Sequence, residues 1–130
     1  MGWKQAHALT LEVYRSTPRL PSDQRFGLVS QMQRASVSVP ANIAEGFKRR
    51  GRANKVCFYN IAQGSLEELR YYFILCRDRG YKLEYEQLAG QADQISRMLR
   101  LVGDEPFPPV YPYRLLPTVY CSHAPSPPAP

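Results

Sequence analysis

The chain has few of the side chains that build metal and catalytic sites. It contains two histidines, His7 and His123, and three cysteines, Cys57, Cys76 and Cys121. The cysteines are odd in number and lack C-x-x-C spacing, whereas structural zinc sites use four clustered Cys or His ligands. The sequence therefore predicts neither a structural zinc site nor the paired cysteines of a small secreted domain.

Catalytic motifs and long apolar runs are also missing. Neither histidine lies near a Ser or Cys nucleophile motif, and Gly46 and Gly51 lack the G-K-[ST] pattern of a phosphate-binding loop. Glu67 and Glu68 are adjacent, so on a helix they point in different directions and do not pair at a metal. No uncharged apolar run approaches the roughly 20 residues that span a bilayer. We expect a soluble, cytoplasmic protein without catalytic activity, metal or cofactor.

The chain carries an excess of positive charge. Seventeen Lys and Arg stand against eleven Asp and Glu, which gives a formal net charge of +6 and a pI near 9.4. Such an excess favours polyanionic partners through long-range attraction. A chain of 130 residues has the size of one domain.

Proline marks the end of the predicted folded part. Nine of the twelve prolines lie from Pro106 onward. Proline removes a backbone donor and breaks helices and central strands. The sequence therefore predicts a domain over residues 1–103, followed by a Pro-rich extended or disordered tail over residues 104–130.

Apolar residues recur at spacings of three and four throughout residues 1–103, without sustained period-two alternation. This pattern predicts an all-α protein, and four helices with short connections predict an antiparallel up-and-down four-helix bundle. Pro40 removes the bond to the carbonyl of Ser36, which predicts a kink or a division into two shorter helices. The predicted helices run from about Trp3 to Ser16, Asp23 to Lys48, Ala53 to Arg79 and Glu84 to Val102.

The third predicted helix has a wider apolar surface than one core requires. Its apolar positions cover an arc of roughly 200°, whereas burial on one side needs a stripe of roughly 100°. One part of this arc, with Ile61, Tyr72 and Leu75, predicts contact with another subunit. Gly64 and Ser65 are poor helix formers, and Gly costs about 1 kcal/mol relative to Ala in a helix interior. They predict close packing at this point.

A line of polar residues runs along the second predicted helix. Spacings of three and four place these residues on one side of the helix. The line is either a solvated face or a polar seam against a neighbouring helix or subunit. On the second predicted helix the candidate seam residues are Arg34, Ser38, Asn42 and Glu45. On the third predicted helix the candidate seam or interface residues are Ser65, Glu68, Tyr72 and Leu75.

The segment KRRGRANK concentrates positive charge. It holds five cations in eight residues: Lys48, Arg49, Arg50, Arg52 and Lys55. Cations are stabilised at a helix C-terminus, but five exceed what the macrodipole needs. The run is either a patch that contacts the phosphates of nucleic acid or a solvated loop.

Two stretches resemble a known family. FGLVSQMQRASVSVPANIAEGFKRRG, from Phe26 to Gly51, and FYNIAQGSLEELR, from Phe58 to Arg70, resemble the four-helix bundle proteins encoded in intervening sequences of bacterial 23S rRNA genes. The chain also looks like the related accessory variability proteins of diversity-generating retroelements. The resemblance covers about Trp3 to Val102. It implies a pentameric barrel of four-helix protomers with a basic surface and, in the retroelement branch, a complex with a reverse transcriptase and its RNA.

Two functions are compatible with these patterns. The first is a homo-oligomeric accessory protein that binds RNA or DNA, with a reverse transcriptase as the partner that the retroelement branch implies. The alternative is a self-assembling scaffold or protein adaptor, encoded in an rRNA intervening sequence. Its basic surface would then serve solubility or an acidic protein partner.

Overall fold

The computed structural model describes residues 2–103, and within this range it contains four long α-helices and no strand. The predicted all-α fold with four helices is confirmed. The predicted tail over residues 104–130 lies outside the described residues. The helices are α1 Trp3–Ser16, α2 Ser30–Lys48, α3 Arg52–Asp78 and α4 Tyr85–Gly103.

The connection between α1 and α2 is irregular. It consists of 3-10 turns at Thr17–Arg19 and Ser22–Gln24 and a π-helical segment, Arg25–Val29, that leads directly into α2. Pro18 and Pro21 interrupt the chain here because proline cannot donate the bond that a continuing helix needs. The second α-helix begins at Ser30, later than the predicted Asp23, because the residues between them form a 3-10 turn and the π-helical segment.

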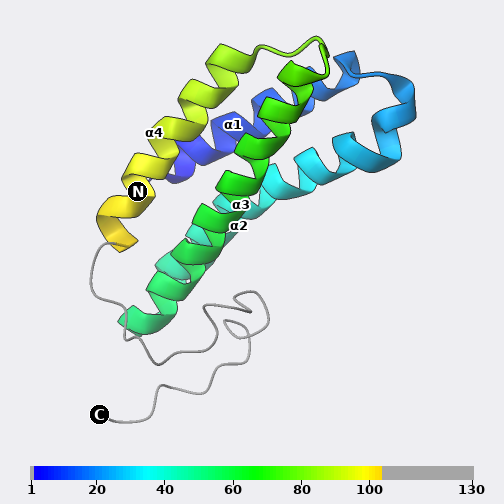
Figure 1. The fold of residues 1–130 in the computed structure, drawn as a ribbon. Helices are drawn as coiled ribbons and strands as arrows, with labels where there is room; N and C mark the ends of the chain where they lie inside the picture. Colours follow the sequence, from blue (N-terminus) through cyan, green and yellow to red (C-terminus); the bar gives the residue numbers. More distant parts are fainter. Residues whose placement is uncertain (1, 104–130) are drawn as a thin grey trace.

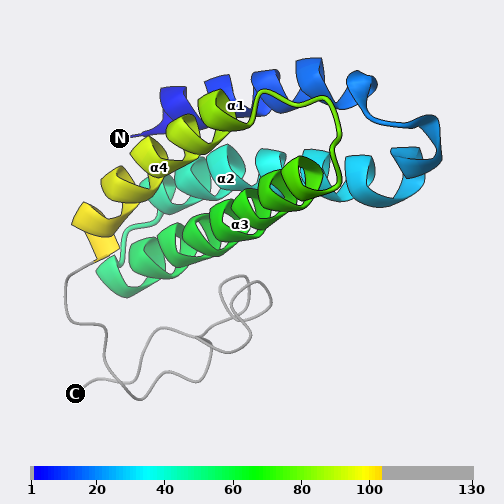
Figure 2. The ribbon, with the colours of Figure 1, turned by 45° about the horizontal axis from the view of Figure 1, so that its top comes forward.

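The four helices pack side by side around one core (Figures 1 and 2). α3 packs between α2 and α4, and α1 packs against the same two helices from the other side, so α1 and α3 are diagonal neighbours. Met32 near the start of α2 contacts Cys76 near the end of α3, and Gly46 lies against Tyr59 near the start of α3. Both ends of α2 are therefore held against α3.

The core draws apolar side chains from all four helices. Each such side chain contributes about 1.5–3 kcal/mol when it is fully buried. Their spacing of three and four residues is the pattern from which the helices were predicted. The largest fully buried residues include Leu9, Val13, Met32, Val39, Leu66, Leu69, Phe73, Leu88 and Ile95.

Pro40 lies inside α2, which continues through it as one α-helix. The division into two shorter helices is therefore wrong. Because Pro40 has no N–H, the carbonyl of Ser36 lacks its donor within the helix. The hydroxyl of Thr10 in α1 lies 2.8 Å from this carbonyl and 3.0 Å from the carbonyl of Ala6 in its own helix, so its single proton is shared between the two and the Ser36 carbonyl is the nearer acceptor. Thr10 and Ser36 are both buried. A neighbouring helix thus supplies the hydrogen bond that the proline removes.

Thr10→Val should lower the free energy of unfolding by about 1–3 kcal/mol, because it leaves a buried carbonyl without a donor. Urea unfolding followed by circular dichroism measures this loss. Pro40→Ala restores the N–H within α2. In the Pro40→Ala background, Thr10→Val should lower the free energy of unfolding by less than about 1 kcal/mol. Equal costs in the two backgrounds would contradict this account.

Candidate functional site

The structure brings three of the candidate seam residues together where α2 meets α3. The hydroxyls of Ser38 and Ser65 lie 2.7 Å apart. The side-chain amide of Asn42 donates to the carbonyl of Ser38 at 2.7 Å and lies 3.0 Å from its hydroxyl. These short polar side chains allow the two helices to approach closely while their polar atoms remain hydrogen-bonded.

The other candidate seam residues lie apart from this contact. Glu45 pairs with Arg49 of its own helix end at 2.9 Å. On α3, the hydroxyl of Tyr72 donates to Glu68 at 2.9 Å. The pKa of this phenol is raised, mainly by burial and to a smaller extent by the hydrogen bond to Glu68. The remaining two, Arg34 on α2 and Leu75 on α3, are exposed and half-buried respectively. Within one protomer, the candidate seam residues that meet across α2 and α3 are Ser38, Asn42 and Ser65.

Close packing lies at Gly46 and not at Gly64. Of the two residues expected to mark close packing, Ser65 contacts Ser38 of α2, whereas a Cβ atom at Gly64 would meet nothing within 4 Å in the protomer. A Cβ atom at Gly46 would lie 2.8 Å from Cε1 of Tyr59 and 3.1 Å from Cβ of Phe58. The absence of a side chain at Gly46 lets the last turns of α2 lie directly on the first turns of α3. This contact fixes the connection that carries the basic run.

Two cations of the basic run hold this connection in place. The amino group of Lys55 donates to the carbonyl of Phe47 at 2.9 Å, which satisfies one of the free carbonyls at the end of α2. Arg49 pairs with Glu45, and its guanidinium carbon lies 4.8 Å from the ring centroid of Phe58. The other three cations of the run, Lys48, Arg50 and Arg52, are exposed. The run therefore combines a structural role with outward-facing charge.

Further cations lie at the same end of the bundle. Trp3 lines a pocket together with Lys48, and Gly2 lies against Met98 near the end of α4. The start of α1 and the end of α4 thus adjoin the α2–α3 connection (Figure 1). We refer to the cations gathered here as the basic end. They are Lys4, Lys48, Arg49, Arg50, Arg52, Lys55, Arg97 and Arg100.

The basic end accounts for the whole net charge of the described residues. Counted together with Glu45, its eight cations give +7; Asp93, one turn before Arg97 on α4, pairs with Arg70 and is counted with the rest. The rest of residues 2–103 contains eight Lys and Arg and eight Asp and Glu, and is balanced. Sequence reasoning missed Lys4, Arg97 and Arg100, because only the packing of α1 and α4 brings them beside the run.

The opposite end of the bundle is built from the other two connections. Arg19 of the α1–α2 connection pairs with Glu84 of the α3–α4 connection at 3.7 Å. Arg25 lies over the ring of Phe26, which is 90% exposed. The two connections hold four cations, Arg19, Arg25, Arg79 and Lys82, and two carboxylates, Asp23 and Glu84, so the excess of charge at this end is smaller.

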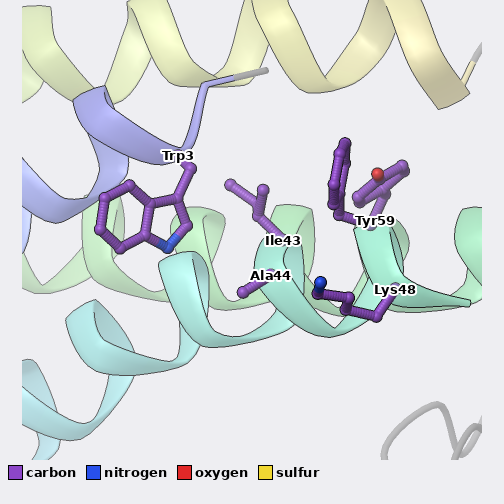
Figure 3. A pocket seen from close by; sticks show the side chains of 6 residues that line it. Trp3, Ile43, Ala44, Lys48 and Tyr59 are labelled. Carbon is purple, nitrogen blue, oxygen red and sulfur yellow. The ribbon is translucent and has the colours of Figure 1, made fainter.

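An apolar pocket of about 320 Å³ opens within the basic end (Figure 3). It lies between the start of α1, the last turns of α2 and the first turns of α3. In Figure 3, Trp3 and Tyr59 stand on opposite sides of Ile43, and the amino group of Lys48 turns toward the space between them. The lining residues are Trp3, Ile43, Ala44, Phe47, Lys48 and Tyr59.

The described residues contain little other chemistry. Cys76 is a buried free thiol, and burial raises its pKa to about 11, so it is protonated at neutral pH. Between residues 2 and 103, no three His, Cys, Asp or Glu side chains cluster in a way that could hold a metal ion. None of the helices in this range is both long and apolar enough to cross a membrane.

Comparison with known proteins gives a family match and a structural match. The family model described as 23S rRNA-intervening sequence protein matches residues 1–101. The fold is similar to that of a protein with unknown function from the S23 ribosomal protein family of Bacteroides thetaiotaomicron VPI-5482. The TM-score is 0.73 with 22% identity, over 79% of this chain and 98% of that chain. No curated protein matches the chain.

Proposed function

This chain belongs to the 23S rRNA-intervening sequence protein family, and we propose that it is an oligomeric accessory protein that binds nucleic acid through its basic end. The observation that carries the proposal is the distribution of charge. Eight cations and one carboxylate gather at one end, while the rest of residues 2–103 is balanced. Helix dipoles do not produce this field, because two helices begin and two end here. The field comes from side chains, which are the groups that contact phosphates.

Salt dependence of binding tests this function. Cations that neutralise phosphates release condensed counterions, so log affinity falls linearly with log salt, by about 0.9 per phosphate on duplex DNA and about 0.7 on single strands. We expect a slope that corresponds to roughly four phosphates per protomer, and weak sequence preference. Fluorescence anisotropy with labelled RNA and DNA at several salt concentrations measures it. An affinity that does not change with salt would contradict phosphate contact.

The protomers are proposed to be antiparallel up-and-down bundles that assemble into a ring, which the family resemblance implies is a pentamer. A closed ring joins two different patches of the protomer, head to tail. Exposed apolar residues occur on the diagonal helices α1 and α3. We define the α1 patch as Leu11 and Tyr14 with the nearby Val37 of α2, and the α3 patch as Tyr71 and Ile74.

The interface residues expected from the sequence adjoin the α3 patch. Tyr72 and Leu75 directly follow Tyr71 and Ile74 along α3 and are half-buried. The rings of Tyr71 and Tyr72 lie 6.2 Å apart. A ring built through these patches would repeat the basic end on one rim, where several weak phosphate contacts add by multivalency.

A reverse transcriptase is the protein partner that the resemblance implies. A reverse transcriptase gene beside this one would support the retroelement role, whereas a position within a 23S rRNA gene would support the insert-encoded role. The alternative function, a scaffold or adaptor, uses the same apolar patches for assembly. It predicts an intact oligomer that binds no nucleic acid.

A further inference from the structure

We propose that the pocket of the basic end receives one base of a single-stranded nucleic acid. The inference rests on the proposed function and names the class of nucleic acid that the basic end prefers. The pocket, of about 320 Å³, lies at the small end of the roughly 300–1,000 Å³ range of small-molecule sites.

Aromatic side chains in the pocket are exposed within the most highly charged region of the protein. Trp3 is 42% exposed and Phe47 is 66% exposed. Trp3 stacks on His7 with ring centroids 5.2 Å apart, and the amino group of Lys55 lies 5.6 Å from the ring centroid of Phe47. Both rings are therefore held by a neighbour before any ligand arrives. Tyr59 is a buried residue of the lining, and its burial raises the pKa of the phenol, which stays neutral.

The charge around the pocket favours a nucleotide over other occupants. An apolar ligand gains nothing from Lys48 in the lining or from the other cations of the basic end, and a free phosphate gains nothing from aromatic walls. A nucleotide of a single strand offers both a flat aromatic base and a phosphate. Lys48 lines the pocket and also belongs to the basic run, so this side chain connects the pocket with the cations proposed to contact phosphates.

Single strands fit this arrangement better than duplexes. Unpaired bases stack readily on aromatic side chains, and this stacking tolerates any sequence. A base within a duplex must first be unpaired and unstacked before it can enter a pocket. The basic end should therefore bind both forms through phosphates but gain additional affinity only from the single strand.

Trp3 makes the inference measurable, because it is the only tryptophan in the chain. The full chain is titrated with short oligo-dT and oligo-U, a duplex of equal length, and inorganic polyphosphate. Both single strands should quench Trp3 emission and bind about five- to a hundredfold more tightly than the duplex. Polyphosphate should bind without quenching, since it carries charge but no base.

Phe47→Ala tests the contribution of the pocket independently of the phosphate contacts. Phe47 is largely exposed, so its truncation should leave the fold intact. Single-strand affinity should fall about five- to a hundredfold, to the level of the duplex, while duplex affinity is unchanged. The matched control is Phe26→Ala, which removes an exposed phenylalanine at the opposite end of the bundle. This control should change neither affinity.

The failures of the two proposals are distinguishable. Equal affinity for single strands and duplex, with Trp3 emission unchanged, would overturn the pocket inference but leave the basic end as a phosphate-binding surface. A change in Trp3 emission on dilution of the protein alone would assign the pocket to a second copy of the chain and also overturn it. Absence of binding to every polyanion would overturn the proposed function itself.

Discussion

Replacing Lys48 and Arg50 together by Glu should abolish measurable nucleic-acid binding at physiological salt. Both side chains are exposed, and reversing them removes four units of charge from an end whose cations and Glu45, within residues 2–103, sum to +7. If each contacts one phosphate, the salt slope of any remaining binding should fall by about 2. Anisotropy at low and physiological salt measures both effects. Arg49 is left unchanged because it pairs with Glu45 and packs on Phe58.

The matched control reverses the same amount of charge at the other end of the bundle. Arg25 and Lys82 are exposed and belong to the two connections there. The length of α2 separates the ends by on the order of 25 Å, well beyond the screening length of about 8 Å. Arg25→Glu with Lys82→Glu should therefore bind nearly as tightly as the parent. Equal loss in both variants would mean that net charge, and not the basic end, drives binding.

Leu11→Glu and Ile74→Glu should each convert the ring into monomers. The first places a charge in the α1 patch and the second in the α3 patch, and an unpaired charge is strongly disfavoured in an apolar interface. Light scattering coupled to size exclusion should show the parent at about five times 14.9 kDa and each variant at 14.9 kDa. Helicity should persist because both side chains are exposed.

Mixing the two variants tests the head-to-tail arrangement. Each keeps the patch that the other has lost, so an equimolar mixture should form a dimer of about twice 14.9 kDa that cannot close a ring. The double variant should remain monomeric. Gln94→Glu, at an exposed position of α4, is the control and should assemble normally. A parent protein that is monomeric at micromolar concentration would contradict the assembly.

Much of the helical layout could be predicted from the sequence. The bounds of α1 agree because Pro18 and Pro21 interrupt its periodic pattern, and those of α3 and α4 differ by one residue at each end. The start of α2 was missed because the π-helical segment before it has no local signal. The continuity of α2 through Pro40 depends on the hydroxyl of Thr10 in another helix.

The candidate site was only partly visible in the sequence. The basic run is contiguous and needs no tertiary information. Arg97 and Arg100 join it because the end of α4 packs beside the start of α1. Trp3 and Tyr59 are far apart in the chain, so the pocket between them leaves no sequence pattern. Two glycines also look alike in sequence, and only the neighbouring helix shows that Gly46 is packed tightly.

The central claim is that nucleic acid binds at the basic end, and acetylation footprinting of the lysines tests it most directly. The chain has four lysines: Lys4, Lys48 and Lys55 at the basic end, and Lys82 in the α3–α4 connection. A saturating oligonucleotide should slow acetylation of Lys4 and Lys48 and leave that of Lys82 unchanged, because phosphates cover the amino groups they contact. Mass spectrometry reads all four sites in one sample. Protection of Lys82 to the same extent as Lys48, or unchanged acetylation at all four, would contradict the account.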